Sequence, residues 1–340
     1  MTIQKNAPET ARRAVSAQRE SALRRIARSS PLLQVLSVIV LLLACGITIS
    51  GFFSKSSLYT TLILASFLGI AAAGETLVIL IGGIDLSVPS VISGANLVVT
   101  LLAGKHWPFA LAVLFVLVCA AAVGVVNGFV THRFHAPPLI VTLATGAVVT
   151  GLTLGWTRGG QVSGSPPGWL TNFSAPIGTT LGIPIPAVIV LWALTAVVIG
   201  VVLHLSVSGR RLYATGANEL AAELAGVRTE RVWVSSFTVS AVASAVVGIV
   251  LVGFTGQGEA GVGDQYLFLA LAAVLVGGTS LVGARGDYWR TVLGALIMTL
   301  ITTILIGHGA GEAQQEILTG ILILVFVGLY GRERRVRDRV

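Results

Sequence analysis

The chain has 340 residues, of which 54% are hydrophobic and only 11% are charged, and its formal net charge is +8. Because a soluble domain carries about 25% charged residues, these charges are too few to cover a water-exposed surface, which excludes an ordinary soluble protein. The basic residues are confined to the two ends and to short loops between apolar runs. We therefore expect membrane lipid, and not nucleic acid, as the charged partner.

Ten apolar runs approach or reach the length, roughly 17–25 residues, that a helix needs to cross a bilayer. They are 31–52, 58–81, 88–104, 107–131, 138–156, 186–205, 232–255, 267–283, 291–307 and 315–331. This pattern predicts an all-α fold, a polytopic transmembrane helical bundle that occupies residues 31–331. The basic segments 1–30 and 332–340 are expected to be tails outside the bilayer.

The distribution of lysine and arginine predicts the orientation of this bundle. If the N-terminus is cytoplasmic and the chain crosses ten times, 19 of the 22 Lys and Arg residues fall on the cytoplasmic side. Only Lys55, Lys105 and Arg158 fall outside, as the positive-inside rule requires. Both termini are therefore expected in the cytoplasm, with 206–231 as the longest internal loop. The longest external segment, 157–185, either lies on the surface or re-enters the membrane.

A sequence that reads L-I-G-G-I-D-L-S-V-P-S interrupts the second apolar run. The run ends at Gly82 and Gly83, meets Asp85, and restarts with Ser87 as the expected helix cap and Pro89 in the first turn. An acidic side chain at such a break is costly unless it is paired or hydrated, and broken helices often line transport cavities. Alternatively, Asp85 only caps a helix at the cytoplasmic interface.

This stretch is the first of four blocks that follow one another along the chain. They read TLVILIGGIDLSVPS at 76–90, NGFVTHRFHAPPLIVTLAT at 127–145, GRRLYATGANELAAELAGV at 209–227 and FLALAAVLVGGTSLVGARG at 268–286. Over residues 35–330 the chain thereby resembles the ribose-type permeases of bacterial ABC sugar importers. The first block of that family usually reads G-G-I-D-L-S-V-G-S, and Pro89 replaces the last Gly of this pattern here.

The resemblance implies a bundle like that of type II ABC importers, in the bacterial plasma membrane, without catalytic residues. It implies transport of a monosaccharide or related polyol, driven by separate ATPase subunits. The other implied partners are a second permease copy or a paralogue and an extracytoplasmic sugar-binding protein. No G-x-x-x-x-G-K-[ST] pattern occurs in the sequence, so we expect no nucleotide cofactor in this chain.

The internal loop contains a short amphipathic helix. Asn218 is a good N-cap, Glu219 suits the first turn, and Gly226 suits the position after the last turn. Leu220 and Leu224 belong to an apolar stripe between them. The resemblance implies that this is the coupling helix, which docks in a groove of the ATPase; alternatively, it lies on the lipid interface. The implied coupling residues are Arg210, Tyr213, Gly216, Asn218, Glu219, Leu220, Ala222, Leu224 and Gly226.

Polar residues within the apolar runs are the candidates for the translocation path: Glu75, Gly82, Gly83, Asp85, Ser87, Asn127, Thr142 and Thr145. A carboxylate at Glu75 suits sugar hydroxyls, but Glu75 is alternatively a protonated or locally paired group at a helix contact. Asn127, Thr142 and Thr145 alternatively form only interhelical hydrogen bonds.

Outside the membrane, Glu259 and Asp264 either face the binding protein or belong to an ordinary acidic loop. The five histidines show no paired spacing, so no metal site is predicted. Two other functions remain open. One is an ABC permease for nucleosides or branched-chain amino acids, and the other is a proton-coupled secondary transporter that uses Glu75 and Asp85.

Overall fold

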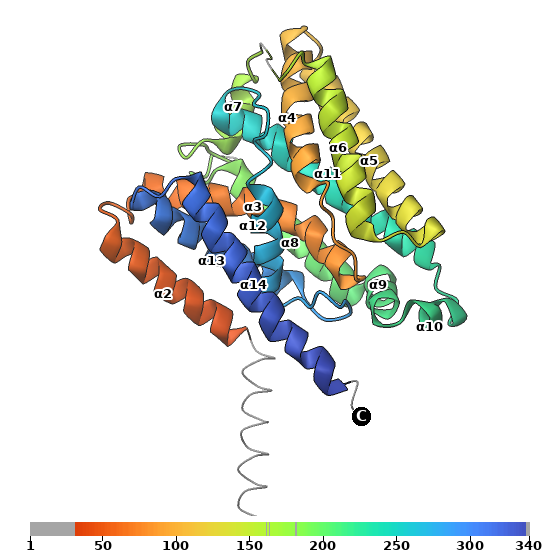
Figure 1. Cartoon of the computed structure of the whole chain (residues 1–340). Coiled ribbons are helices and arrows are strands. Elements are labelled where there is room, and N and C mark those ends of the chain that lie inside the picture. The colour runs from red at the N-terminus through yellow and green to blue at the C-terminus, as the bar shows by residue number, and fades with distance from the viewer. Residues whose placement is uncertain (1–30, 161, 163, 181, 338–340) are drawn as a thin grey trace, which may run out of the picture.

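The computed structural model describes residues 31–337 except 161, 163 and 181, and the side chains of 326, 327 and 329–337 are also left undescribed. The predicted tail 1–30 and the last three residues of the tail 332–340 lie outside the described residues. All regular structure in the described part is helical (Figure 1), apart from one isolated bridge between Thr180 and Ile183. The predicted all-α class is therefore confirmed.

Thirteen helices make up this part of the chain. They are α2 (Leu32–Thr48), α3 (Lys55–Leu80), α4 (Val88–Gly104), α5 (Phe109–Phe134), α6 (Pro138–Trp156), α7 (Gly168–Ser174), α8 (Ala187–Leu205), α9 (Val207–Ala217), α10 (Glu219–Leu224), α11 (Thr229–Thr255), α12 (Tyr266–Val276), α13 (Tyr288–Gly307) and α14 (Glu312–Arg337). Each of the ten predicted runs falls on one of them. Among the described residues, α3, α5, α6, α8, α11 and α13 are long and apolar enough to cross a membrane. The count of ten spans stays a prediction.

The predicted span 267–283 is wrong in its second half, because α12 ends at Val276. Gly277 and Gly278 follow, and Gly278 has a φ of 91°, in the left-handed region that ends helices. The eleven residues of α12 rise about 16 Å, roughly half of the hydrocarbon core. Hydropathy misses this end because Gly, Thr and Ser after Val276 are compatible with either a helix or a turn.

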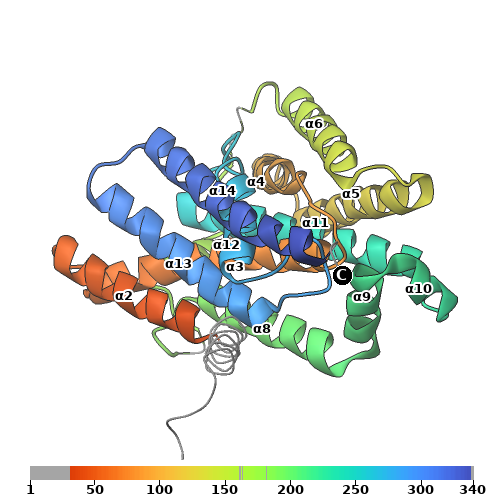
Figure 2. The same ribbon diagram turned by 60° about the horizontal axis from the view of Figure 1, so that its bottom comes forward.

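Helix α3 lies at the centre of the bundle, surrounded by α8, α11, α12 and α13 (Figure 2). Its most apolar window is 89% buried, and apolar residues cover all its sides, as expected for a helix enclosed by other helices. The matching windows of α5 and α6 are only 22% buried. Lipid or another chain therefore covers the outer faces of these two helices.

Glycines allow α11 to pack so closely on its neighbours that their backbones are in contact. A Cβ atom on Gly124 of α5 would lie 2.4 Å from the Thr238 Cα of α11. On Gly128 it would lie 2.5 Å from the Val234 Cα, and on Gly74 of α3 it would lie 2.3 Å from the Ser240 Cα. Because lipid tails give helices little hydrophobic reason to associate, such close approach supplies much of the packing energy. Helix α11 is thus held between α3 and α5.

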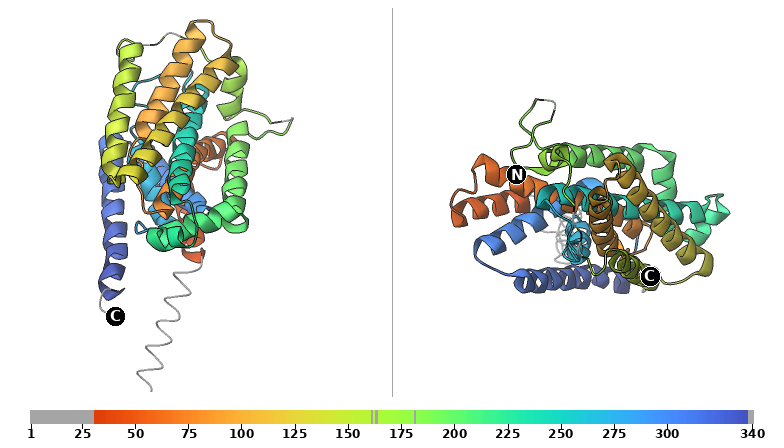
Figure 3. Two further views of the ribbon diagram at one scale, coloured as in Figure 1. Left: turned by 90° about the vertical axis from the view of Figure 1, so that its right-hand side faces the viewer. Right: turned by 90° about the horizontal axis from the view of Figure 1, so that it is seen from above.

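The start of α2, the pair α9–α10 and the end of α14 lie at one end of the bundle (Figures 1 and 3). The predicted orientation requires this arrangement, since it places the loop 206–231 and both termini on one side. Within the predicted external segment, α7 packs on α11. Its Leu170 is 2% exposed, and the Ser174 hydroxyl donates to the Val250 carbonyl at 3.0 Å.

The glycine contacts of α11 predict which small changes the bundle tolerates. The substitution Gly124→Ala forces the backbones of α5 and α11 apart at their contact. It should lower the free energy of unfolding by about 1–3 kcal/mol, as over-packing does. Gly151→Ala on α6 is the matched control, because a Cβ there meets nothing within 4 Å. Thermal midpoints of the detergent-purified variants measure the difference. Equal midpoints for the two variants would contradict this packing.

Candidate functional site

The interruption predicted after α3 is present. Helix α3 ends at Leu80, Gly82 takes a φ of 85°, and α4 begins at Val88 with Pro89 in its first turn, as expected. Only Gly adopts this φ at little cost, so Gly82 permits the sharp turn out of α3. The residues 81–87 therefore form a non-helical connection between α3 and α4.

Ser87 is the N-cap residue of α4, as predicted, but its side chain makes no capping hydrogen bond, and that part of the prediction is wrong. Its hydroxyl donates to the Asp85 Oδ1 atom at 2.5 Å, and its backbone N–H donates to the same oxygen at 3.0 Å. The Ser87 oxygen in turn accepts from Asn127 Nδ2 of α5 at 3.0 Å. Ser87 has helical backbone angles, φ −82° and ψ −12°, whereas a residue that caps with its side chain has an extended backbone.

Two threonines of α6 join the same network. The Thr145 hydroxyl donates to Asn127 Oδ1 at 2.6 Å, and the Leu86 backbone N–H donates to the Thr142 Oγ1 at 3.1 Å. The segment 81–87 therefore forms hydrogen bonds with α5 and α6 as well as within itself. Asn127 and Thr145 thus form an interhelical hydrogen bond, and Thr142 bonds to the non-helical segment; any contact of these residues with substrate stays a prediction.

Glu75 closes the network from the side of α3. Its Oε1 atom accepts from the Asp85 backbone N–H at 3.3 Å. Both carboxyl groups are buried, with 3% of Glu75 and 2% of Asp85 exposed. The second oxygens, Glu75 Oε2 and Asp85 Oδ2, have no hydrogen-bond partner in the described chain, although the Ser240 hydroxyl lies beside Asp85 outside bonding geometry. The structure thus gathers the predicted polar candidates of the translocation path into one buried cluster.

The end of α3 also contacts the internal loop through Gly216 of α9. A Cβ atom on Gly216 would lie 1.9 Å from the Leu80 carbonyl oxygen, so only glycine fits there. The same carbonyl accepts from the Ala284 N–H at 2.8 Å. The non-helical segments that follow α3 and α12 therefore contact each other and α9 at one place.

Tyr213 provides a second contact between α9 and the segment that follows α12. Its hydroxyl donates to the Gly286 carbonyl at 2.8 Å. Burial, together with the nearby Asp287 carboxylate, raises the pKa of Tyr213 to about 12, so the phenol stays a neutral donor. Arg210, the other predicted coupling residue on α9, is exposed.

The short helix α10 has the predicted caps. The Asn218 side chain accepts from the Ala221 N–H at 3.0 Å, and Gly226 has a φ of 82°. Leu220 and Leu224 are 67% and 83% exposed, whereas Ala222 is buried against the bundle. Figure 2 shows α10 at the outer edge of the molecule beyond α9. The apolar stripe therefore faces away from the rest of the chain.

The acidic side chains of α10 tie it to two long helices. Trp233 Nε1 of α11 donates to Glu219 Oε1 at 2.7 Å, and the Thr229 hydroxyl donates to Glu223 Oε1 at 2.5 Å. His132 Nε2, at the end of α5, lies 3.5 Å from Glu219 Oε1 and 3.7 Å from Glu223 Oε1. These three side chains are close enough to surround a cation, but the Oε1 atom of each carboxylate already accepts a hydrogen bond from the protein.

At the opposite end, Glu259 and Asp264 line a hollow of about 440 Å³ together with Glu312 and Glu316 of α14. The Glu259 N–H donates to Asn96 Oδ1 of α4 at 2.8 Å, which holds the loop in place. The two predicted residues therefore belong to an acidic rim. Its role as a binding-protein surface stays a prediction.

Comparison with known proteins agrees with the resemblance in the sequence. Residues 57–327 match the family described as the permease component of branched-chain amino acid transport systems. The chain belongs to this permease family. The ribose import permease RbsC of Bacillus subtilis (strain 168) is 33% identical over 295 residues, 86% of this chain and 90% of that protein. No solved structure matches the chain.

Two further relatives show the range of named substrates. RbsC of Escherichia coli (strain K12) is 31% identical, over 89% of this chain and 95% of its own. The fructose import permease FrcC of Rhizobium meliloti is 30% identical, over 90% of this chain and 87% of its own. The permease is thus a multi-pass membrane protein from a family of transport subunits.

Several residues of these clusters were not predicted. His132, Thr229 and Trp233 contact α10, and His132 lies 97 residues before Thr229, so no local pattern joins it to the other two. One signal was available: Glu219 and Glu223 are four residues apart, which places both on the polar side of a short helix. That spacing indicates a shared face for the two carboxylates but does not indicate their partners in the bundle.

Asn127 is the residue that joins the break to both α5 and α6, so its removal should loosen the cluster. Asn127→Leu keeps the volume but removes both bonds, and we expect a loss of about 1–3 kcal/mol in stability with reduced uptake. Asn172→Leu is the control, because Asn172 is exposed on α7. Thermal midpoints and transport rates would be compared. A stable, fully active Asn127→Leu permease would contradict the role of this network.

Proposed function

We propose that this permease is the membrane subunit of a bacterial ABC importer that moves a monosaccharide or related polyol across the plasma membrane. The exposed apolar face of α10 carries the proposal. Leu220 and Leu224 are exposed although they are apolar, and the acidic residues of the same helix hold it against α5 and α11. A rigid, apolar, outward face of this kind is suited to a groove on a soluble partner.

The partner for that face is the ATPase subunit of the importer, which binds the ATP, so the permease itself needs no catalytic group or cofactor. In this arrangement both termini and the loop 206–231 are cytoplasmic, and the tails 1–30 and 332–340 flank the membrane domain 31–331. A second copy or a paralogue completes the translocation path, and an extracytoplasmic binding protein delivers the sugar. Glu259 and Asp264 on the opposite rim are the proposed contacts for that protein.

A sugar fits better than the alternatives for two reasons. The names of the similar permeases RbsC and FrcC specify ribose and fructose. The buried cluster also contains carboxyl, amide and hydroxyl groups, which are the groups that bind sugar hydroxyls. The family description names branched-chain amino acids, which keeps an amino-acid permease as the second candidate.

The mechanism we propose is alternating access driven from α10. Movement of α10 reaches α5 through His132 and α11 through Trp233, while Gly216 of α9 presses on the end of α3. ATP-driven closure of the two ATPases would shift these helices together. The cavity between the two permease subunits would then change the side to which it opens.

The coupling role is tested by placing a charge on the apolar face of α10. Leu224→Asp should weaken ATPase binding at least tenfold and abolish ATP-driven uptake, because burying an unpaired carboxylate in an apolar groove costs more than about 1.4 kcal/mol, the equivalent of tenfold. Ile177→Asp is the control, since Ile177 is equally exposed, at 87%, in the predicted external segment. Binding of purified ATPase to permease in nanodiscs measures the effect. Normal binding and uptake in Leu224→Asp would exclude α10 as the docking helix.

The proton-coupled alternative is tested at Glu75. In proteoliposomes that contain the permease, the ATPases and the binding protein, we expect uptake to need ATP and to continue when the proton gradient is collapsed. Glu75→Gln keeps the acceptor for the Asp85 N–H and should leave uptake dependent on ATP. Uptake that proceeds without ATPase, follows an imposed proton gradient and is lost in Glu75→Gln would overturn the ABC proposal.

A further inference from the structure

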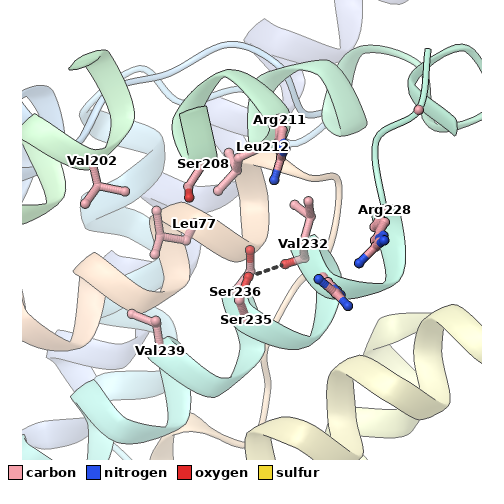
Figure 4. Close-up of a pocket in the computed structure, with 12 residues that line it drawn as sticks. Leu77, Val202, Ser208, Arg211, Leu212, Arg228, Val232, Ser235, Ser236 and Val239 are labelled. Carbon is pink, nitrogen blue, oxygen red and sulfur yellow. Dashed lines mark hydrogen bonds between the residues drawn. The ribbon is translucent and has the colours of Figure 1, made fainter. Parts of the chain in front are cut away.

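An arginine-lined hollow opens beside α9, at the end of the bundle that carries α10. It has a volume of about 610 Å³ and lies between α3, α8, α9 and α11. Arg211, Arg228 and Arg231 line it, and Figure 4 shows Arg211 and Arg228 pointing toward the space between α9 and α11. None of the residues that line it is acidic, and none of these arginines forms an ion pair with a described carboxylate.

The hollow also contains a buried hydroxyl without a partner. Ser236 of α11 lines it, is 2% exposed, and its Oγ makes no hydrogen bond in the described chain. The neighbouring Ser235 hydroxyl already donates to the Val232 carbonyl at 3.1 Å (Figure 4). An unsatisfied buried hydroxyl costs free energy unless something binds it, so Ser236 indicates a ligand with a polar oxygen.

The remaining walls are apolar and reach into the spans. Leu77 of α3, Val202 of α8 and Val239 of α11 line the side away from the arginines. A second hollow of about 410 Å³ shares Arg231, Ser235 and Val239 and continues along α11, with Glu230 at its edge. The site therefore combines a cationic mouth, hydroxyl groups and an apolar wall that extends along an exposed helix face.

We propose that this hollow binds an anionic phospholipid. Its phosphate would lie among Arg211, Arg228 and Arg231 and accept from Ser236, while an acyl chain would lie along Val202 and Val239. Arginine suits phosphate because its guanidinium donates two parallel hydrogen bonds. A basic pocket between membrane helices is a recognised setting for an anionic head group, and a soluble phosphate would not need the apolar wall. Under the proposed orientation the lipid belongs to the cytoplasmic leaflet.

The lipid would link the membrane to the coupling region. Arg211 belongs to α9, and Arg228 lies between α10 and α11. A head group held by both would fix the position of α9 relative to α11 near the point where α10 is attached. We therefore expect anionic lipid to support coupling as well as stability. This expectation rests on the proposed function, whereas the lipid binding itself does not.

The experiment uses delipidated full-length permease in detergent, titrated with phosphatidylglycerol or phosphatidylcholine and followed by native mass spectrometry. We expect one phosphatidylglycerol per chain with clear preference over phosphatidylcholine. The double variant Arg211→Gln/Arg228→Gln should bind it about 25-fold more weakly, since one arginine contributes about fivefold. The charge-matched control Arg133→Gln/Arg285→Gln removes two exposed arginines that do not line the hollow and should bind normally.

Ser236→Ala is the second variant and should fold normally, because it removes a hydroxyl that has no partner in the chain. We expect it to weaken phosphatidylglycerol binding about fivefold. Equal affinity for the two lipids, or equal loss in both double variants, would overturn the proposal. Displacement of the lipid by inorganic phosphate at similar concentration would assign the site to a soluble anion. Loss of ATPase binding with unchanged lipid affinity in Arg211→Gln/Arg228→Gln would assign the arginines to the ATPase surface.

Discussion

The break between α3 and α4 is the constraint on which the rest of the structure depends. Inside a bundle that excludes water, each backbone and carboxyl group of residues 81–87 needs a partner. Asn127 of α5 donates to Ser87, and Thr142 of α6 accepts from the Leu86 N–H. Glu75 of α3 accepts from the Asp85 N–H, while the Asp85 Oδ2 atom has no partner in the described chain. The positions of α4, α5 and α6 relative to α3 therefore follow from satisfying one short polar segment.

The same segment connects the membrane helices to the docking region. The Leu80 carbonyl, at the end of α3, accepts from Ala284 after α12 and contacts Gly216 of α9. The non-helical segments that follow α3 and α12 thus meet near the end of α9. A shift of α9 toward α3 would displace the end of the central helix, because Gly216 leaves no space between the two backbones. This contact gives the loop 206–231 a direct mechanical connection to the buried cluster.

Local signals in the sequence were sufficient where the deciding contact is local. Asn218, Gly226 and Pro89 have the predicted places because caps and first turns depend on residues within four positions. Ser87 does not cap with its side chain because its backbone is helical, and its hydroxyl instead bonds to Asp85 and to Asn127 on another helix. The ten runs identified the helices, but hydropathy did not detect the end of α12 at Val276. Hydropathy also could not predict that His132 lies beside α10. These features depend on tertiary contacts that one sequence does not display.

Helix α11 explains how a short surface helix can act on a buried cluster. Near one end, Trp233 bonds to α10, and further along, Ser240 lies beside Asp85. Between and around these points α11 touches α3 at Gly74 and α5 at Gly124. At such contacts backbone meets backbone, so there are no long side chains whose rotation can absorb a displacement. Movement imposed at α10 is therefore expected to displace α11 as a rigid body, and α11 carries that displacement to the polar break.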